Sequence, residues 1–158
     1  MNINVPKQSI DALKIIVNKI QDKNLRWVLG GSMALAIQGV DVKVNDINIF
    51  TDTDSADKIS EILKEYAMEP MHFQSNSQFR AYYGLFEIKG VQVELIANLE
   101  YMYDNIWIRK ENQETLMFIN FANMTLPLLD LKEEYEAYKR MGRTEKANKI
   151  LEALKKKA

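Results

Sequence analysis

Apolar and polar residues follow two periods along the chain, and these predict a series of helices and strands. Apolar residues recur every three or four positions where a helix buries one face, and every second position where a strand does. The helical period covers Ser9 to Asp22, Met33 to Ile37, a segment capped by Asp54 or Ser55, Leu131 to Met141, and Thr144 to Lys156. The strand pattern covers Arg26 to Leu29, Val44 to Thr51 and much of Met71 to Ile96.

The order of these elements indicates the fold class. Strands and helices alternate early, Lys89-Gly90 suits a tight hairpin turn, and helices split at Gly142 finish the chain. The region Ile106 to Met124 is ambiguous, with strands expected near Trp107 and over Thr115 to Phe121. We therefore predict an α+β (mixed α/β) fold in a single domain over 1–158, with a mixed sheet packed against helices over about 1–125 and a C-terminal helical tail over about 126–158.

Composition narrows the chemistry that this fold can carry. The chain has 158 residues, 47% apolar and 27% charged, which suffices for an ordinary core, and its formal charge of −1 gives no overall attraction to nucleic acid. The absence of cysteine and the single His72 exclude disulfides, thiolate nucleophiles and multi-histidine clusters, so any metal should be a hard cation held by oxygen. With no leader pattern and no membrane-length apolar run, we expect a cytoplasmic protein without membrane contact.

The turn Gly30-Gly31-Ser32 stands between an apolar strand and a helix. Such a turn presents free backbone N–H groups and the positive end of the helix dipole, and its glycines let a ligand approach. The Ser32 hydroxyl can donate to a phosphate oxygen. The pattern therefore fits a phosphate site, although Gly-Gly before a helix is often only a turn with a capping serine.

Asp46-Ile47-Asn48-Ile49 places an acid and an amide on the same face of a predicted strand, with Cα atoms roughly 6.5 to 7 Å apart. Their oxygens can converge on a divalent ion, although a solvated edge strand is the commoner setting of such a pair. Glu94 is a lone acid inside the apolar strand Val91 to Ile96, where an unpaired charge is costly to bury. If the two strands are neighbours, Asp46, Asn48 and Glu94 form one oxygen cluster beside the glycine turn.

These residues resemble the signature of the polymerase-beta-like nucleotidyltransferase superfamily. The resemblance rests on Gly31-Ser32, 13 intervening residues, Asp46-Ile47-Asn48-Ile49, and later Val93-Glu94-Leu95. The pattern is most similar to small stand-alone prokaryotic members, the lincosamide-type antibiotic nucleotidyltransferases and the minimal nucleotidyltransferase-like proteins. Leu126 to Leu154 is more loosely similar to their helical tail.

The resemblance implies transfer of a nucleoside monophosphate from a nucleoside triphosphate (NTP) to an acceptor hydroxyl, with release of pyrophosphate. Gly31 and Ser32 would hold the β and γ phosphates. Asp46 and Asn48 would ligate Mg²⁺, and Glu94 would act as a metal ligand or as the general base beside the acceptor hydroxyl. Carboxylates suit this role because Mg²⁺ prefers oxygen ligands in near-octahedral geometry.

The sequence departs from the family at Asn48, where members carry a second acid. An amide oxygen can ligate Mg²⁺ but adds no charge, and one unit charge at about 4 Å from another is worth on the order of 4 kcal/mol at an effective dielectric near 20. Either the site transfers nucleotides weakly, or the protein has lost transfer and kept a nucleotide-binding or partner-binding role, for example in a toxin–antitoxin pair. The sequence leaves both alternatives open.

Two residues of the helical tail, Arg143 and Lys146, can reach a triphosphate, although a solvated first turn of a surface helix explains them as well. The acceptor stays open among a small molecule, a protein and an RNA end, because Pro70 to Arg80 and Tyr101 to Thr125 carry no recognisable motif. The oligomeric state is also left open, and a homodimer is one alternative because a small antiparallel sheet with aromatic strands can pair with a second copy.

Overall fold

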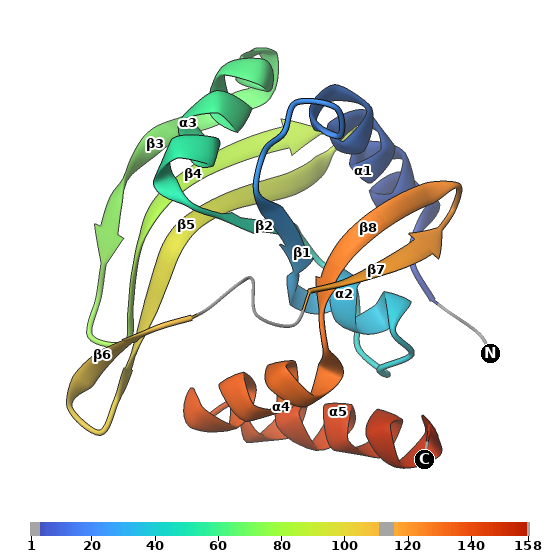
Figure 1. Ribbon diagram of the computed structural model, residues 1–158, viewed down its shortest axis with the longest axis vertical. Helices are drawn as coiled ribbons and strands as arrows, with labels where there is room; N and C mark the ends of the chain where they lie inside the picture. The colour runs from blue at the N-terminus through green and yellow to red at the C-terminus, as the bar shows by residue number, and fades with distance from the viewer. Residues whose placement is uncertain (1–3, 111–115, 158) are drawn as a thin grey trace.

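The computed structural model describes residues 4–110 and 116–157, which form a mixed sheet with helices packed on it (Figure 1). The predicted α+β class is confirmed. In chain order the elements are α1 Lys7–Ile20, β1 Trp27–Gly30, α2 Gly31–Ile37, β2 Ile47–Thr51, α3 Thr53–Ile62, a 3-10 turn at Lys64–Tyr66, β3 Ala67–Ser75, β4 Phe79–Ile88, β5 Val91–Tyr103, β6 Ile106–Arg109, β7 Leu116–Phe121, β8 Met124–Leu129, α4 Leu131–Arg140 and α5 Thr144–Lys157.

The strands of the described chain form one sheet in the order β3-β4-β5-β2-β1-β8-β7, with β6 paired to β5. β1 and β2 are antiparallel, whereas β2 runs parallel to β5 and β1 runs parallel to β8. β2 therefore lies in the middle of the sheet, with the glycine turn at the end of one neighbour and Glu94 within the other.

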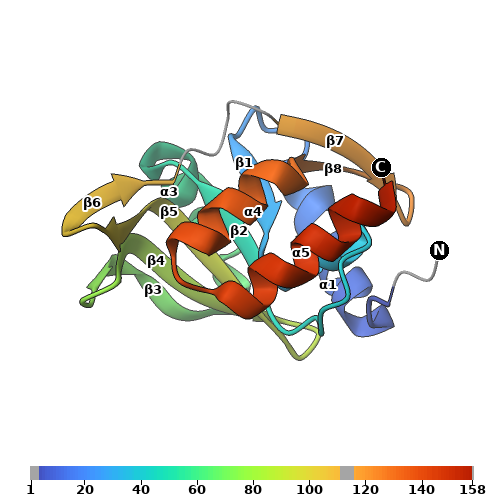
Figure 2. The ribbon, with the colours of Figure 1, turned by 90° about the horizontal axis from the view of Figure 1, so that it is seen from below.

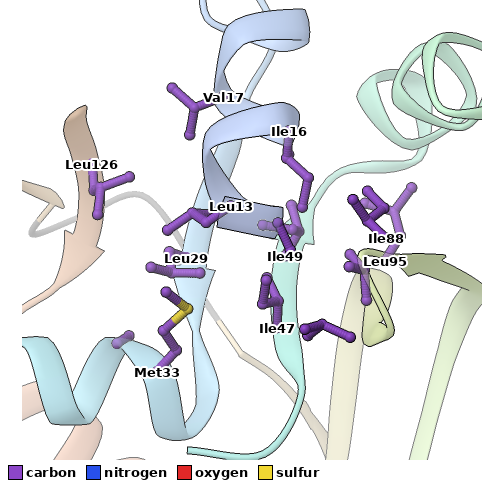
Figure 3. Close-up of a cluster of buried hydrophobic side chains, with 14 of the residues drawn as sticks. Leu13, Ile16, Val17, Leu29, Met33, Ile47, Ile49, Ile88, Leu95 and Leu126 are labelled. Atoms are coloured by element: carbon purple, nitrogen blue, oxygen red, sulfur yellow. The ribbon is translucent and has the colours of Figure 1, made fainter. Parts of the chain in front are cut away.

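The main core lies on one face of this sheet, under α1 and α3. Figure 3 shows Leu13 and Ile16 of α1 above Leu29, Ile47 and Ile49 of the central strands, all at most 1% exposed. Because side chains alternate along a strand, burying Ile47 and Ile49 in this core turns the residue between them to the opposite face. The core thus sets the direction of position 48.

The helical tail lies across that opposite face, where α4 and α5 pack side by side (Figure 2). Its apolar residues join residues of the α2 region in a second cluster: Leu35, Val40, Leu131, Tyr138, Ala147, Ile150 and Ala153. All residues of α2 are buried, and α2 contributes to both clusters. This short helix therefore ties the sheet to the tail.

Two predicted boundaries differ because of local pairing. The tail begins at Leu131 rather than near 126, because Met124–Leu129 forms β8 and pairs with β1 and β7. A short apolar run of this kind fits a strand or a helix equally well by its pattern. The helix α3 is capped by Asp52, whose carboxylate accepts the Ser55 N–H at 2.8 Å, and not by Asp54 or Ser55.

The ambiguous region contains β6 and β7, and the part of the second predicted strand at Thr115 lies outside the described residues. In the described ranges, no helix is both long and apolar enough to cross a membrane.

Candidate active site

A row of residues crosses the centre of the sheet on the face that the helical tail covers. Gly30 of β1 pairs with Asn48 of β2, and Asn48 pairs with Glu94 of β5. The expected pairing of β2 with β5 is confirmed. Directly paired residues point to the same face, so the Asn48 and Glu94 side chains are neighbours.

Asp46 lies immediately before β2, not within it as expected, because β2 begins at Ile47. Its carboxylate nevertheless lies close enough to Glu94 to raise the pKa of that residue. The structure therefore brings together the three residues that the sequence singled out, Asp46, Asn48 and Glu94.

Glu94 is half-buried and keeps its proton more readily than an ordinary glutamate. Burial is the main cause of its raised pKa, and the negative charge of Asp46 adds to it. A hydrogen bond from the Tyr83 phenol opposes the increase, because it stabilises the carboxylate. The pKa of Tyr83 is raised in turn, first by burial and then by the charge of Glu94. In the described chain, no ion pair includes Asp46 or Glu94.

The Asn48 amide has one side packed and one side unsatisfied. A methyl group at Gly31 would lie 2.4 Å from Asn48 Nδ2, so the amide fits only because residue 31 has no side chain. Asn48 Oδ1 is buried and has no hydrogen-bond partner among the described residues. Leaving a buried amide oxygen without a partner is energetically costly, so this oxygen is available as a ligand for a cation.

The glycine turn has a packing role of its own. Gly31 has a φ of 66°, a left-handed conformation that glycine favours, and a methyl group at Gly30 would lie 2.2 Å from the Phe50 ring. The Ser32 hydroxyl accepts the Asn45 N–H at 3.1 Å, which fixes the loop that leads into β2. These contacts explain the glycines without a ligand, and none of the three turn residues lines the adjacent cavity.

That cavity has a volume of about 680 Å³ and opens between the polar row and the helical tail. Its volume is within the usual range for small-molecule sites. The sheet contributes Asn48, Phe50, Glu94, Ile96 and Tyr83, the tail contributes Tyr138, Met141 and Arg143, and the β3–β4 end contributes residues between 73 and 81. Asp46 lies beside this space rather than in its lining.

Lys110 and Tyr138 are cavity residues that sequence reasoning missed. The Lys110 side chain is only 7% exposed, with Nζ 3.0 Å from Glu134 Oε1 and 4.8 Å from the centre of the Phe50 ring. Burial, followed by the charge of Glu134, raises the pKa of Tyr138. A lone lysine after an ambiguous strand gives no sign of such burial, because its partner is 24 residues further along the chain.

Of the two predicted phosphate ligands in the tail, only Arg143 lines the cavity. The Arg143 guanidinium and the Lys146 ammonium lie 5.7 and 5.6 Å from the centre of the Tyr138 ring. Burial, together with the charge of Arg143, lowers the pKa of Lys146. The tail thus places two cations around one buried tyrosine at the cavity wall.

The donor atoms suit a hard cation but do not form a full cage. Within 4–110 and 116–157, no group of three His, Cys, Asp or Glu side chains lies together as a metal site. Asp46 and Glu94 with the unpaired Asn48 Oδ1 nevertheless give two carboxylates and a neutral oxygen, which is the oxygen chemistry that Mg²⁺ prefers. These residues fit a divalent ion that also takes ligands from a bound substrate.

This sheet, in which Asp46, Asn48 and Glu94 form an acidic row that faces the helical tail, has the architecture of a nucleotidyltransferase. A structure from Thermotoga maritima, described as that of a nucleotidyltransferase, is 29% identical, with a TM-score of 0.82 over 97% of this chain and 96% of the other. The structure of ANT(2″)-Ia in complex with adenylyl-2″-tobramycin is 13% identical, with a TM-score of 0.58 over 92% and 88% of the two chains, which shows a shared fold. No curated protein matches the chain.

The sequence profile of the aminoglycoside-2″-adenylyltransferase family matches residues 12–154. The chain therefore belongs to this family, and the expected nucleotidyltransferase class is confirmed at that level. The narrower resemblance to lincosamide-type or minimal members stays a prediction.

Proposed function

We propose that the protein transfers a nucleoside monophosphate from an NTP to an acceptor hydroxyl, in a Mg²⁺-dependent reaction centred on Asp46, Asn48 and Glu94. The observation that carries the proposal is the meeting of two carboxylates and an unpaired buried amide oxygen at the edge of a ligand-sized cavity. A divalent ion would offset the repulsion of the acids and neutralise the triphosphate.

In this proposal Glu94 is the general base. Its raised pKa makes it a better proton acceptor than an ordinary carboxylate, and the Tyr83 hydrogen bond fixes its orientation. Glu94 takes the acceptor's proton as the acceptor oxygen bonds to the α phosphorus, the bond from that phosphorus to the bridging oxygen breaks, and pyrophosphate leaves. Asp46 and Asn48, which lie beside Glu94, would supply oxygen ligands to the Mg²⁺ ion.

The cations of the tail and the glycine turn would hold the phosphates. Arg143 lines the cavity wall and Lys146 lies beside it, both next to the Tyr138 ring. Both side chains can therefore contact a triphosphate bound on that side of the cavity. Gly30, Gly31 and Ser32 offer backbone N–H groups at the start of α2, next to position 48. This assignment follows the family resemblance and the nearness of the turn to Asn48.

The experiment is calorimetric titration of ATP, GTP, CTP and UTP with Mg²⁺ into the natural protein and its variants. We expect metal-dependent binding of at least one nucleotide, loss of binding in Asp46→Ala, and no change in Asp104→Asn, a matched control in the exposed β5–β6 turn. If Asp46→Ala binds as well as the natural protein, the proposed site is wrong.

Asn48 favours one alternative, a catalytically lapsed relative that binds a nucleotide or a protein partner. The variant Asn48→Asp separates the two, because it restores the family's acid pair. Binding and pyrophosphate release by the natural protein support the enzyme, whereas binding by Asn48→Asp alone supports the lapsed relative. Localisation in the cytoplasm and assembly as a homodimer stay predictions.

A further inference from the structure

The wall of the cavity contains a buried lysine that the proposed reaction does not use. Lys110 lines the cavity, and its side chain is only 7% exposed. Its backbone N–H donates to the Leu99 carbonyl oxygen of β5 at 2.8 Å, which fixes the chain where it leaves β6. Its ammonium lies 3.0 Å from Glu134 Oε1, and Glu134 lies outside the described cavity lining. A ligand in the cavity therefore meets the positive member of this ion pair.

Stability is a weak reason for a charged pair at this position. Taking two charges out of water costs free energy, and replacing a buried ion pair with apolar residues is often neutral or stabilising. A lysine ammonium also carries three N–H donors. Glu134 is its one ion-pair partner in the described chain, so donors remain for a ligand in the cavity.

Lys110 is one of three cations that surround a single tyrosine ring. Their distances from the centre of the Tyr138 ring are 5.9 Å for the Lys110 ammonium, 5.7 Å for the Arg143 guanidinium and 5.6 Å for the Lys146 ammonium. Among the described residues, Glu134 is the one carboxylate that forms an ion pair with any of them. Three cations against one carboxylate repel one another, and a bound anion would relieve that repulsion. A triphosphate suits such a group, because lysine and arginine donate charge-assisted hydrogen bonds to phosphate oxygens.

We propose that Lys110 binds a phosphate group of the nucleotide, together with Arg143 and Lys146 of the tail. The identity of the ligand as a nucleotide rests on the proposed function. Asn48 adds no negative charge to hold a divalent ion, so metal neutralises less of the triphosphate than it would beside a second acid. A fixed ammonium in the lining of the same cavity supplies part of the missing positive charge.

The test is calorimetric titration of inorganic tripolyphosphate into the full chain in the presence of EDTA. We expect the natural protein to bind, and Lys110→Met combined with Glu134→Gln to bind about tenfold more weakly, because a charge-assisted hydrogen bond to phosphate is lost. This double variant leaves neither member of the pair buried without its partner. Lys64→Met combined with Glu61→Gln removes an exposed ion pair of the same 3.0 Å length, and this matched control should bind like the natural protein.

A second measurement needs no substitution. In the natural protein, the carbon-13 resonance of Lys110 Cε should shift saturably as tripolyphosphate is added, whereas that of the exposed Lys64 should stay in place. The proposal is overturned if tripolyphosphate does not bind, if the two double variants bind it equally well, or if the Lys110 resonance does not move.

These titrations contain no divalent ion, so their outcome does not depend on metal binding by Asp46, Asn48 and Glu94. If tripolyphosphate binds through Lys110 but no nucleotide binds with Mg²⁺, the proposed function fails and the phosphate-binding role of Lys110 stands. If nucleotides bind with Mg²⁺ but the Lys110 double variant binds tripolyphosphate as the natural protein does, only the role of Lys110 fails.

Discussion

The structure buries two glutamates in opposite electrostatic settings. Glu134 of α4 is 1% exposed and has Lys110 Nζ 3.0 Å from its Oε1. Glu94 of β5 is half-buried and faces Asp46, with no ion pair among the described residues. Buried charges are normally paired, and an unpaired carboxylate in a cavity points to a functional site. The junction of sheet and tail thus pairs its own charges, whereas the acidic row has no such pair and is the site that we propose for a ligand.

The largest effect should come from breaking the completed pair. Glu134→Gln leaves the Lys110 ammonium buried without its counter-charge, so we expect the free energy of unfolding to fall by about 3–5 kcal/mol in denaturant titrations. Combining it with Lys110→Met should restore most of that loss, because no buried charge remains. Glu61→Gln breaks the exposed Lys64–Glu61 pair and should cost less than about 1 kcal/mol. Equal losses in Glu134→Gln and Glu61→Gln would contradict the comparison.

Gly31→Ala disturbs the acidic row through packing alone. The alanine must adopt a left-handed φ of 66°, and its methyl group must displace the Asn48 amide. We therefore expect the free energy of unfolding, measured by thermal or chemical unfolding, to fall by about 2–4 kcal/mol. Gly142→Ala is the matched control: its φ is 77°, but nothing lies within 4 Å of the added methyl, and we expect about 1 kcal/mol. Similar losses for both would show that the Asn48 contact is unimportant.

Glu94→Gln should abolish nucleotide transfer without destabilising the fold. Removing one of two facing acids should raise the free energy of unfolding at neutral pH by about 0.2–1 kcal/mol. The folded-state pKa of Glu94 is above the unfolded value of 4.5, so its stabilising contribution is full below pH 4.5 and is lost as pH rises through the folded pKa. Unfolding measured across that range should show this decline in the natural protein and not in Glu94→Gln. A stability that rises with pH in step with Glu94 titration would refute this reading.

The sequence predicted the acidic row because strand alternation is a local rule. Once Ile47 and Ile49 are assigned to the core, Asn48 must face the other way, and the lone acid of an apolar strand marks Glu94 in the same manner. The pairing of β2 with β5 was a conditional expectation, which the register confirms. The roles of these residues in binding and catalysis stay predictions.

The sequence could not predict what depends on contacts between distant segments. The sequence places the start of the helical tail near 126, inside β8, because the apolar run of this strand has no period of its own and only its pairing with β1 and β7 defines it. Lys110 resembles a surface lysine until Glu134 and Phe50 surround it. Gly30 and Gly31 also leave space for the Phe50 ring and the Asn48 amide, and these contacts likewise form only in the folded chain.

Tyr83→Phe should have the smallest effect on stability and the most specific effect on Glu94. The Tyr83 phenol donates to the carboxylate and lowers its pKa, so its removal should raise the pKa of Glu94 further while costing about 0.5 kcal/mol of stability. Carbon-13 titration of the Glu94 carboxyl measures this directly. Tyr82→Phe is the matched control, because the Tyr82 phenol donates to Asp57 at 2.7 Å, and it should leave Glu94 unchanged. A Glu94 pKa that falls or stays constant in Tyr83→Phe would show that the phenol does not orient this carboxylate.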